Sequence, residues 1–240
     1  MSRQKSKRFS ESKLMSNIIE LGKDNFLSMA GNWNTEFFKN SNPLVIELAC
    51  GKGEYSYGLG KAFPDKNFVG MDIKGSRIYV GAKAAEVDGL SNVAFLRGKI
   101  ENLRSFFGWK EVDEIWITFP DPRPRDKDEK KRLTFTRFLK LYQHIIKDES
   151  IIHLKTDNKP LTDYTVETVL AYGGEVLALT YDLYESEWKG EHLGIQTYFE
   201  DKFTKKGFKI NYLKFRLPHL EKEDEPIPAI FFRKEEMLPS

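Results

Sequence analysis

The chain has 240 residues, of which 40% are hydrophobic and 31% are charged. This composition is typical of a folded globular protein and excludes global disorder, and the length fits one domain. The 38 basic residues nearly balance the 36 acidic residues, so attraction to nucleic acid must come from local charge, and the single cysteine, Cys50, excludes an intramolecular disulfide and a cysteine-built zinc site.

The first 40 residues differ from the rest of the chain. The segment MSRQKSKRFSESK at residues 1–13 is polar and basic, and a short amphipathic stretch at residues 18–26 follows it. No apolar run of signal length follows the basic residues, and no stretch approaches the roughly 18 apolar residues of a membrane span. We therefore expect a cytoplasmic protein with a basic arm and helical region at residues 1–40 and a single domain at residues 41–240.

Beyond residue 40, short apolar runs alternate with helical patterns. Helices are predicted at residues 75–87, with Gly89 as the C-cap, and at residues 135–146, where apolar side chains recur at helical spacing. Such alternation indicates an α/β fold with a mostly parallel sheet and helices on both faces. Residues 174–184 and 209–217 alternate like antiparallel edge strands. The five strand-like runs are residues 43–50, 67–73, 92–98, 112–119 and 150–156.

A glycine-containing turn follows the first predicted strand. In VIELACGKGEY, Gly51 and Gly53 lie where the ligand crevice of an open α/β sheet forms. Asp72 ends the second strand, where a carboxylate can accept hydrogen bonds from ribose hydroxyls or simply cap the next helix. Glu47 lies within an apolar strand and needs either a ligand in the crevice or a nearby lysine, because a buried unpaired carboxylate is costly.

This turn does not fit a pyrophosphate. A dinucleotide site would have a third glycine where Ser56 stands, and the Gly-Lys-Ser/Thr of a P-loop is absent. The pattern acidic-x-Ala-x-Gly-x-Gly at residues 47–53 instead resembles the first motif of S-adenosylmethionine-dependent methyltransferases. Ala49 stands where those proteins usually have their first glycine.

The fourth predicted strand ends in ITFPDPRP. Its prolines bias the residues before them, Phe119, Asp121 and Arg123, to extended conformations and so hold the Asp121 carboxylate in place. The motif resembles the Asn/Asp-Pro-Pro-aromatic motif of amino-directed methyltransferases, and a proline-rich surface turn is the alternative. The basic run that follows favours phosphate contacts, but its interleaved acidic residues are equally typical of a solvated helix face.

With HLKTDN at the end of the fifth strand and QTYFE nearer the C-terminus, the chain resembles the bacterial tRNA (guanine-N7)-methyltransferase family over residues 43–216. The resemblance implies a Rossmann-like fold, S-adenosylmethionine as the cofactor and tRNA as the partner. It implies methyl transfer to N7 of guanosine 46 in the variable loop. We expect a monomer or homodimer, and no metal, because the four histidines show no metal-ligand spacing.

Family roles carry over to matching positions. Asp121 matches the family's catalytic residue. The positions that contact the cofactor in the family correspond here to Glu47, Gly51, Gly53, Asp72 and Asp121. Substrate contacts are implied for Arg125, Asp157, Thr197 and Glu200. The RNA-contacting run corresponds to Lys127, Lys130, Lys131 and Arg132, and a second basic cluster on the arm comprises Arg3, Lys5, Lys7 and Arg8.

The chain departs from the family pattern at several positions. Arg123 replaces the usual tryptophan of Asp-Pro-Trp-Pro, and Arg125 replaces a lysine. Lys99 stands where an Asp or Asn usually contacts the adenine, with Glu101 two residues later. Two other classes remain open, a methyltransferase of a small amine or a protein and a non-catalytic RNA-binding protein with the same fold.

Overall fold

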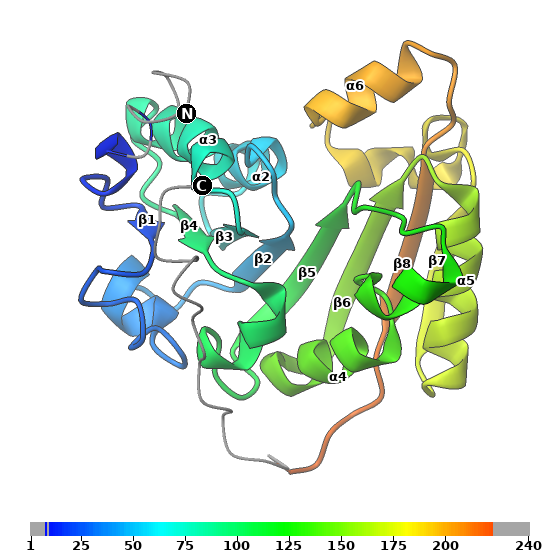
Figure 1. Cartoon of the computed structure of the whole chain (residues 1–240), viewed down its shortest axis with the longest axis horizontal. Coiled ribbons are helices and arrows are strands. Elements are labelled where there is room, and N and C mark those ends of the chain that lie inside the picture. The colour runs from blue at the N-terminus through cyan, green and yellow to red at the C-terminus, as the bar shows by residue number, and fades with distance from the viewer. Residues whose placement is uncertain (1–7, 9, 223–240) are drawn as a thin grey trace.

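The computed structural model describes residue 8 and residues 10–222, and its centre is an eight-stranded sheet (Figure 1). In spatial order the strands are β1 (Ile18–Ile19), β4 (Val93–Arg97), β3 (Asn67–Asp72), β2 (Leu44–Leu48), β5 (Val112–Thr118), β6 (Ile146–Thr156), β8 (Asn211–Arg216) and β7 (Glu175–Thr180). All pairs are parallel except those of β8 with β6 and β7. The mostly parallel α/β sheet is confirmed, and its antiparallel strand β8 lies one place inside the edge that β7 forms.

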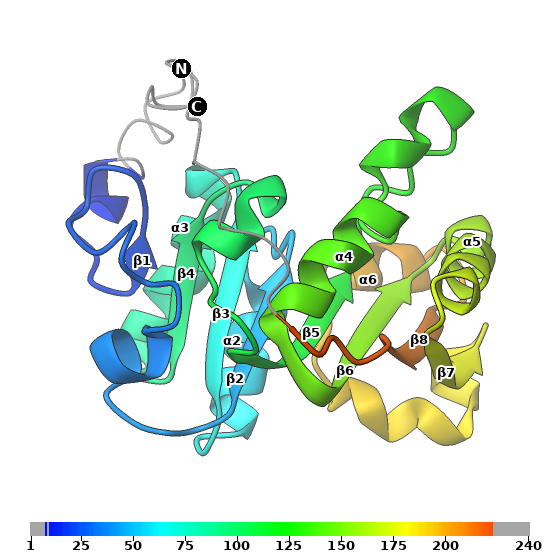
Figure 2. The ribbon, with the colours of Figure 1, turned by 90° about the horizontal axis from the view of Figure 1, so that it is seen from below.

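Helices cover both faces of the sheet, as predicted (Figure 2). Alternate residues of a strand point to opposite faces, so Ile46 joins one hydrophobic core and Val45 joins the other. The first core includes side chains of α4 (Thr136–Ile145), α5 (Lys159–Ala171) and the short helices η1 (Trp33–Phe38) and η2 (Ile100–Ser105). The second includes side chains of α2 (Glu54–Ala62) and α3 (Gly75–Val87).

The N-terminal region differs from its prediction. Within residues 1–40, the described helical structure is limited to residues 8 and 10–12 and the π-helix η1. Ile18 and Ile19 form β1, which pairs with Phe95 and Leu96 of β4 and so belongs to the main sheet. The expected helical region is therefore in part a sheet strand.

The chain order fixes where a ligand can bind. From β2 the chain builds outward through β3 and β4 and then returns to place β5 on the other side of β2. Ligands of open α/β sheets bind at such a reversal, beyond the carboxyl ends of the strands. The helix α6 (Tyr198–Thr204) stands above this end of β5 and β6 (Figure 1). Among the described residues, no helix is long and apolar enough to cross a membrane.

Candidate active site

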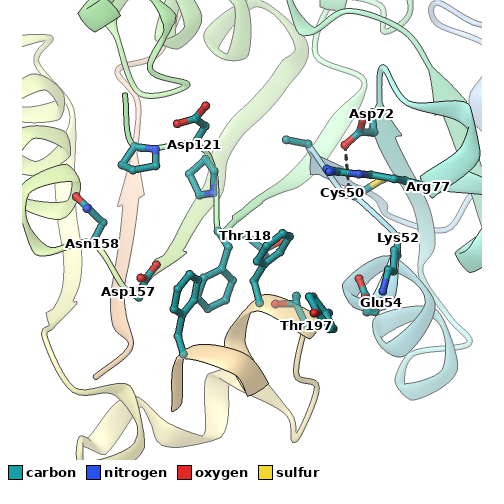
Figure 3. A pocket seen from close by; sticks show the side chains of 18 residues that line it. Cys50, Lys52, Glu54, Asp72, Arg77, Thr118, Asp121, Asp157, Asn158 and Thr197 are labelled. Carbon is teal, nitrogen blue, oxygen red and sulfur yellow. Dashed lines mark hydrogen bonds between the residues drawn. The ribbon is translucent and has the colours of Figure 1, made fainter. Parts of the chain in front are cut away.

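A cavity of about 590 Å³ opens beyond the carboxyl ends of the central strands (Figure 3). Its walls come from the turn after β2, the end of β3, the segment after β5, the segment after β6, and α6. Five residues predicted from sequence line it together, namely Gly51, Asp72, Asp121, Asp157 and Thr197. Residues that are more than 100 positions apart in the sequence thus meet at one cavity.

The turn after β2 is shaped by positive backbone angles. The φ angles of Ala49, Gly51 and Gly53 are 57°, 58° and 72°, in the left-handed region that residues other than glycine rarely adopt. Ala49 therefore carries the strain that the usual glycine would avoid. A Cβ on Gly53 would lie 2.3 Å from the ring of Phe95, whereas a Cβ on Gly51 would meet no atom within 4 Å. Gly53 is thus required by packing, and Gly51 leaves open space beside the cavity.

Asp72 joins this turn to the next helix. Its Oδ2 accepts a hydrogen bond from the Gly51 N–H at 3.0 Å, and its Oδ1 accepts one from the Lys74 N–H at 2.8 Å. The carboxylate is partly exposed and lines the cavity, with the Arg77 side chain beside it (Figure 3). Asp72 thus holds the turn after β2 against the start of α3 and lines the cavity, and its contact with ribose hydroxyls stays a prediction.

Glu47 lies beneath the cavity wall. It is 3% exposed, and Oε2 accepts hydrogen bonds from the N–H of Ser56 at 2.9 Å and its hydroxyl at 2.6 Å. Oε1 accepts one at 2.6 Å from the hydroxyl of Thr118, which does line the cavity. Burial raises the pKa of Glu47 to about 7, although these hydrogen bonds act in the opposite direction. Its observed contacts are with the protein, and direct contact with a cofactor stays a prediction.

The segment after β5 carries the predicted catalytic residue. Asp121 is exposed at the cavity, and its Oδ2 lies 3.1 Å from Nε of Arg123, the residue at the usual tryptophan position. Asp157, which follows β6, lies on the same side of the cavity as Asp121 (Figure 3). Burial raises the pKa of the Asp157 carboxyl. Two carboxylates from neighbouring strands therefore border one part of the cavity.

Thr197 and Glu200 begin α6 as a capping box. The Thr197 hydroxyl accepts from the Glu200 N–H at 3.1 Å, and the Glu200 carboxylate accepts from the Thr197 N–H at 3.4 Å. Glu200 is completely buried, where it forms an ion pair of 2.7 Å with Lys155 and accepts a hydrogen bond of 2.6 Å from the Tyr184 hydroxyl. Thr197 lines the cavity, whereas Glu200 lies behind it, so its predicted substrate contact stays a prediction.

The predicted RNA-contacting run forms the short 3-10 helix η3 (Asp126–Lys131). Asp128 is buried there and pairs with Arg125 at 2.5 Å and with Lys131 at 2.6 Å, which lowers the pKa of its carboxyl. Lys127 and Lys130 are exposed. Asp128 thus neutralises part of the positive charge of this run, whereas Lys127 and Lys130 face the solvent.

The remaining basic residues lie on two surfaces. The Arg132 guanidinium lies 4.2 Å from the ring centroid of Tyr164, and its Nε donates to the carbonyl of Arg123 at 3.2 Å. On the arm, Arg8 lies 5.9 Å from the ring centroid of Tyr79. The other members of that cluster, Arg3, Lys5 and Lys7, fall outside the described residues.

The cavity also has residues that the sequence did not single out. Lys52, Arg77, Phe119 and Phe203 line it. Lys52 and Phe119 belong to the two quoted motifs but had no role assigned to them, and nothing in the local pattern of Arg77 and Phe203 marks them as site residues. Lys99, which stands where the family usually has an Asp or Asn that contacts the adenine, is the N-cap of η2 and does not line the cavity. Within residue 8 and residues 10–222, no group of three or more His, Cys, Asp or Glu side chains is placed to hold a metal ion.

Comparison with known proteins agrees with this architecture. The structure of the 16S rRNA methyltransferase KamB superposes with a TM-score of 0.60 at 15% identity, covering 82% of this chain and 94% of that one. A tryptophan-to-alanine mutant of the 16S rRNA (adenine(1408)-N(1))-methyltransferase from Catenulisporales acidiphilia, determined with the cosubstrate SAM, superposes with a TM-score of 0.52 at 15% identity, covering 82% of this chain and 93% of that one. The fold is therefore the Rossmann-like methyltransferase fold.

Sequence comparison is more specific. A profile of the family described as "Putative methyltransferase" matches residues 41–213. The tRNA (guanine-N(7)-)-methyltransferase of Christiangramia forsetii is 43% identical over 221 residues, which cover 90% of this chain and 99% of that protein. The protein of the same name from Porphyromonas gingivalis is 50% identical over 190 residues, covering 79% and 77%. The chain belongs to the tRNA (guanine-N(7)-)-methyltransferase family.

Proposed function

We propose that this chain transfers a methyl group from S-adenosylmethionine to N7 of guanosine 46 in the variable loop of tRNA. The observation that carries the proposal is the single cavity in which Asp72, suited to a nucleoside, lies across from Asp121 and Asp157. Family membership supports the same reaction. In this account the protein works in the cytoplasm as a monomer or homodimer and needs no metal.

The residues at the β2 and β3 side of the cavity fit S-adenosylmethionine. Gly51 leaves open space where a side chain would stand, so a ligand can approach the backbone there. Asp72 lies at the end of β3, where a carboxylate can accept hydrogen bonds from two ribose hydroxyls. When bound, this cofactor supplies a methyl group activated by its positively charged sulfur. Glu47 supports the site from below through Ser56 and Thr118.

The acceptor side needs little proton chemistry. Guanine N7 has a free lone pair at neutral pH, so no general base is required, and correct positioning is most of the task. The purine becomes cationic as it gains the methyl group. Both Asp121 and Asp157 line the cavity, and in this proposal they stabilise that developing charge, because fixed carboxylates favour positive charge in the transition state.

The outward-facing lysines of η3 suit phosphate groups beside the cavity. Lys127 and Lys130 are exposed a few residues beyond Asp121 along the chain. RNA recognition of this kind uses phosphate contacts, shape and bases that leave their stack. The exposed lysines would hold the tRNA backbone while the guanine enters the cavity.

The proposal can be tested with purified protein, labelled methyl donor and unmodified tRNA that carries either guanosine or adenosine at position 46. We expect label to enter only the guanosine form, and expect that RNA to break at the modified site after reduction and aniline treatment. Label in neither RNA, with measurable binding of the cofactor, would contradict the substrate while leaving the fold intact.

A further inference from the structure

The wall of the cavity formed by α6 is aromatic. Phe203, on this helix, and Phe119, which follows β5, both line the cavity. Their rings are nearly parallel, with an interplanar angle of 22° and centroids 6.4 Å apart. The ring of Phe199, which also lines the cavity, lies at the same angle and centroid distance from the ring of Phe203. Phe119 and Phe203 thus form a nearly parallel pair of rings at the cavity, and Phe119 precedes Asp121 by two residues in the chain.

Phe119 is held in an unusual backbone conformation. Its φ is 48°, in the left-handed region that a bulky residue seldom adopts, and φ of Arg123 is 47°, so the extended backbone predicted for these two residues is wrong. The N–H of Phe119 donates a hydrogen bond of 2.8 Å to the carbonyl oxygen of Lys155 on β6. Strained residues of this kind persist only where the surrounding structure fixes them, and they are typical of functional sites. Here the strain aims an aromatic ring at the cavity.

Lys155 also holds the other half of this wall. Its side chain is completely buried, and Nζ lies 2.7 Å from Oε1 of Glu200 and 4.9 Å from the ring centroid of Tyr55. Glu200 is in the first turn of α6, and Phe203 follows three residues later, which places the two on neighbouring parts of the helix surface. One residue thus binds Phe119 through its backbone and the helix of Phe203 through its side chain.

The buried ion pair between Lys155 and Glu200 is better explained by the placement of α6 than by a gain in the stability of the protein. Removing two charges from water costs about as much as their attraction returns, so apolar replacements of buried pairs are often neutral or stabilising. The helix α6 has seven residues, and a helix of that length does not hold itself in place. The pair between Lys155 and Glu200 fixes where this short helix sits.

We propose that Phe119 and Phe203 form the stacking platform for the acceptor purine, and that Lys155 is the positioning residue that sets this platform. The inference rests on the proposed function, in which a guanine leaves its stack to reach the cavity. Aromatic faces replace the lost base stacking. They also attract the purine more strongly once it carries a positive charge, so the platform favours the transition state over the neutral substrate.

The platform is tested by comparing Phe203→Leu, Phe203→Tyr and Phe208→Leu. Phe203→Leu keeps the apolar volume without the flat face, and we expect kcat/KM for tRNA to fall by about ten- to a hundredfold, the value of one lost stack. Phe203→Tyr keeps the face and should restore activity to within about threefold of wild type. Phe208 lies edge-on to Phe203 but outside the cavity lining, so its leucine variant controls for general loss of aromatic packing.

The role of Lys155 is tested by separating turnover from binding. Lys155→Met should lower kcat by about tenfold or more, while the dissociation constant for tRNA, set by surface lysines, changes little. Should the unpaired Glu200 prevent folding, the double variant Lys155→Met with Glu200→Leu removes both charges, and the same loss of kcat is expected. Wild-type kcat in the folded variant would overturn the positioning role.

The outcomes separate this inference from the function on which it rests. A wild-type protein that does not methylate tRNA would overturn both. An active wild type, together with a Phe203→Leu variant of equal kcat/KM, would overturn the platform and leave the function standing.

Discussion

The buried carboxyl of Glu47 makes a quantitative prediction about stability. In the folded protein its pKa is raised to about 7, mainly by burial, from the value of 4.5. The folded state therefore binds this proton more tightly than the unfolded chain, and the free energy of unfolding falls as the pH rises from 4.5 through 7. Above pH 7 the free energy of unfolding is lower by the full cost of ionising this buried carboxyl, about 3 kcal/mol. Burial lowers the pKa of the nearby Lys155 amine, and the charged form of this amine attracts the Glu47 carboxylate, which makes the figure an upper bound.

Glu47→Gln removes that titration while keeping the shape of the side chain. The amide oxygen can accept the two hydrogen bonds from Ser56, and the amide nitrogen can donate to the hydroxyl of Thr118. Relative to wild type, the free energy of unfolding of the variant is expected to rise by as much as about 3 kcal/mol between pH 4 and pH 8. Urea denaturation at a series of pH values measures this difference.

Glu36→Gln provides the matched control, because the Glu36 side chain is 61% exposed and its ion pair with Lys39 spans 3.4 Å. We expect this control to change stability by less than about 0.5 kcal/mol and without a trend in pH. A difference between Glu47→Gln and wild type that is constant from pH 4 to pH 8 would refute the assignment of a raised pKa to the buried carboxyl.

Three further predictions concern the catalytic loop, the RNA surface and the glycine turn. Asp121→Ala should abolish methyl transfer without lowering the melting temperature, because the side chain is 61% exposed, and near-normal turnover would remove it from the mechanism. Replacing Lys127 and Lys130 by Gln should reduce the slope of log affinity for tRNA against log salt by about one to two, measured by filter binding; an unchanged slope would exclude phosphate contacts. Gly53→Ala should lower the free energy of unfolding by roughly 2–4 kcal/mol, because its Cβ would clash with a ring, and Gly51→Ala by only about 1 kcal/mol; equal losses in urea denaturation would contradict this.

Local patterns were sufficient to predict most of the sheet and the cavity carboxylates on it. The apolar runs that begin near residues 43, 67, 92, 112 and 150 correspond to five strands. Each of these strands is buried on both faces, so its sequence is apolar almost throughout and can be recognised without knowledge of its neighbours. Asp72 is the last residue of one such strand and Asp121 lies three residues beyond the end of another, so both lie at the same edge of the sheet. Their meeting in one cavity followed from this placement.

Other features depend on contacts that no local pattern records. Ile18 and Ile19 form a strand too short to show a periodicity, and only the neighbouring β4 defines it. Phe203 reaches the cavity because α6 folds back over β5 and β6, which its own sequence does not predict. Ser56 on α2 and Thr118 at the end of β5 donate hydrogen bonds to the Glu47 carboxylate, and the local pattern at residues 47–53 does not predict these partners.

The most direct test of the proposed reaction replaces one atom of the acceptor. A tRNA assembled with 7-deazaguanosine at position 46 keeps the pairing edge and shape of the base but has a C–H group in place of N7. We predict that this tRNA binds with normal affinity and takes up no methyl group, while the guanosine form is methylated. Equal methyl incorporation into the two RNAs would contradict N7 as the acceptor and, with it, the proposed reaction.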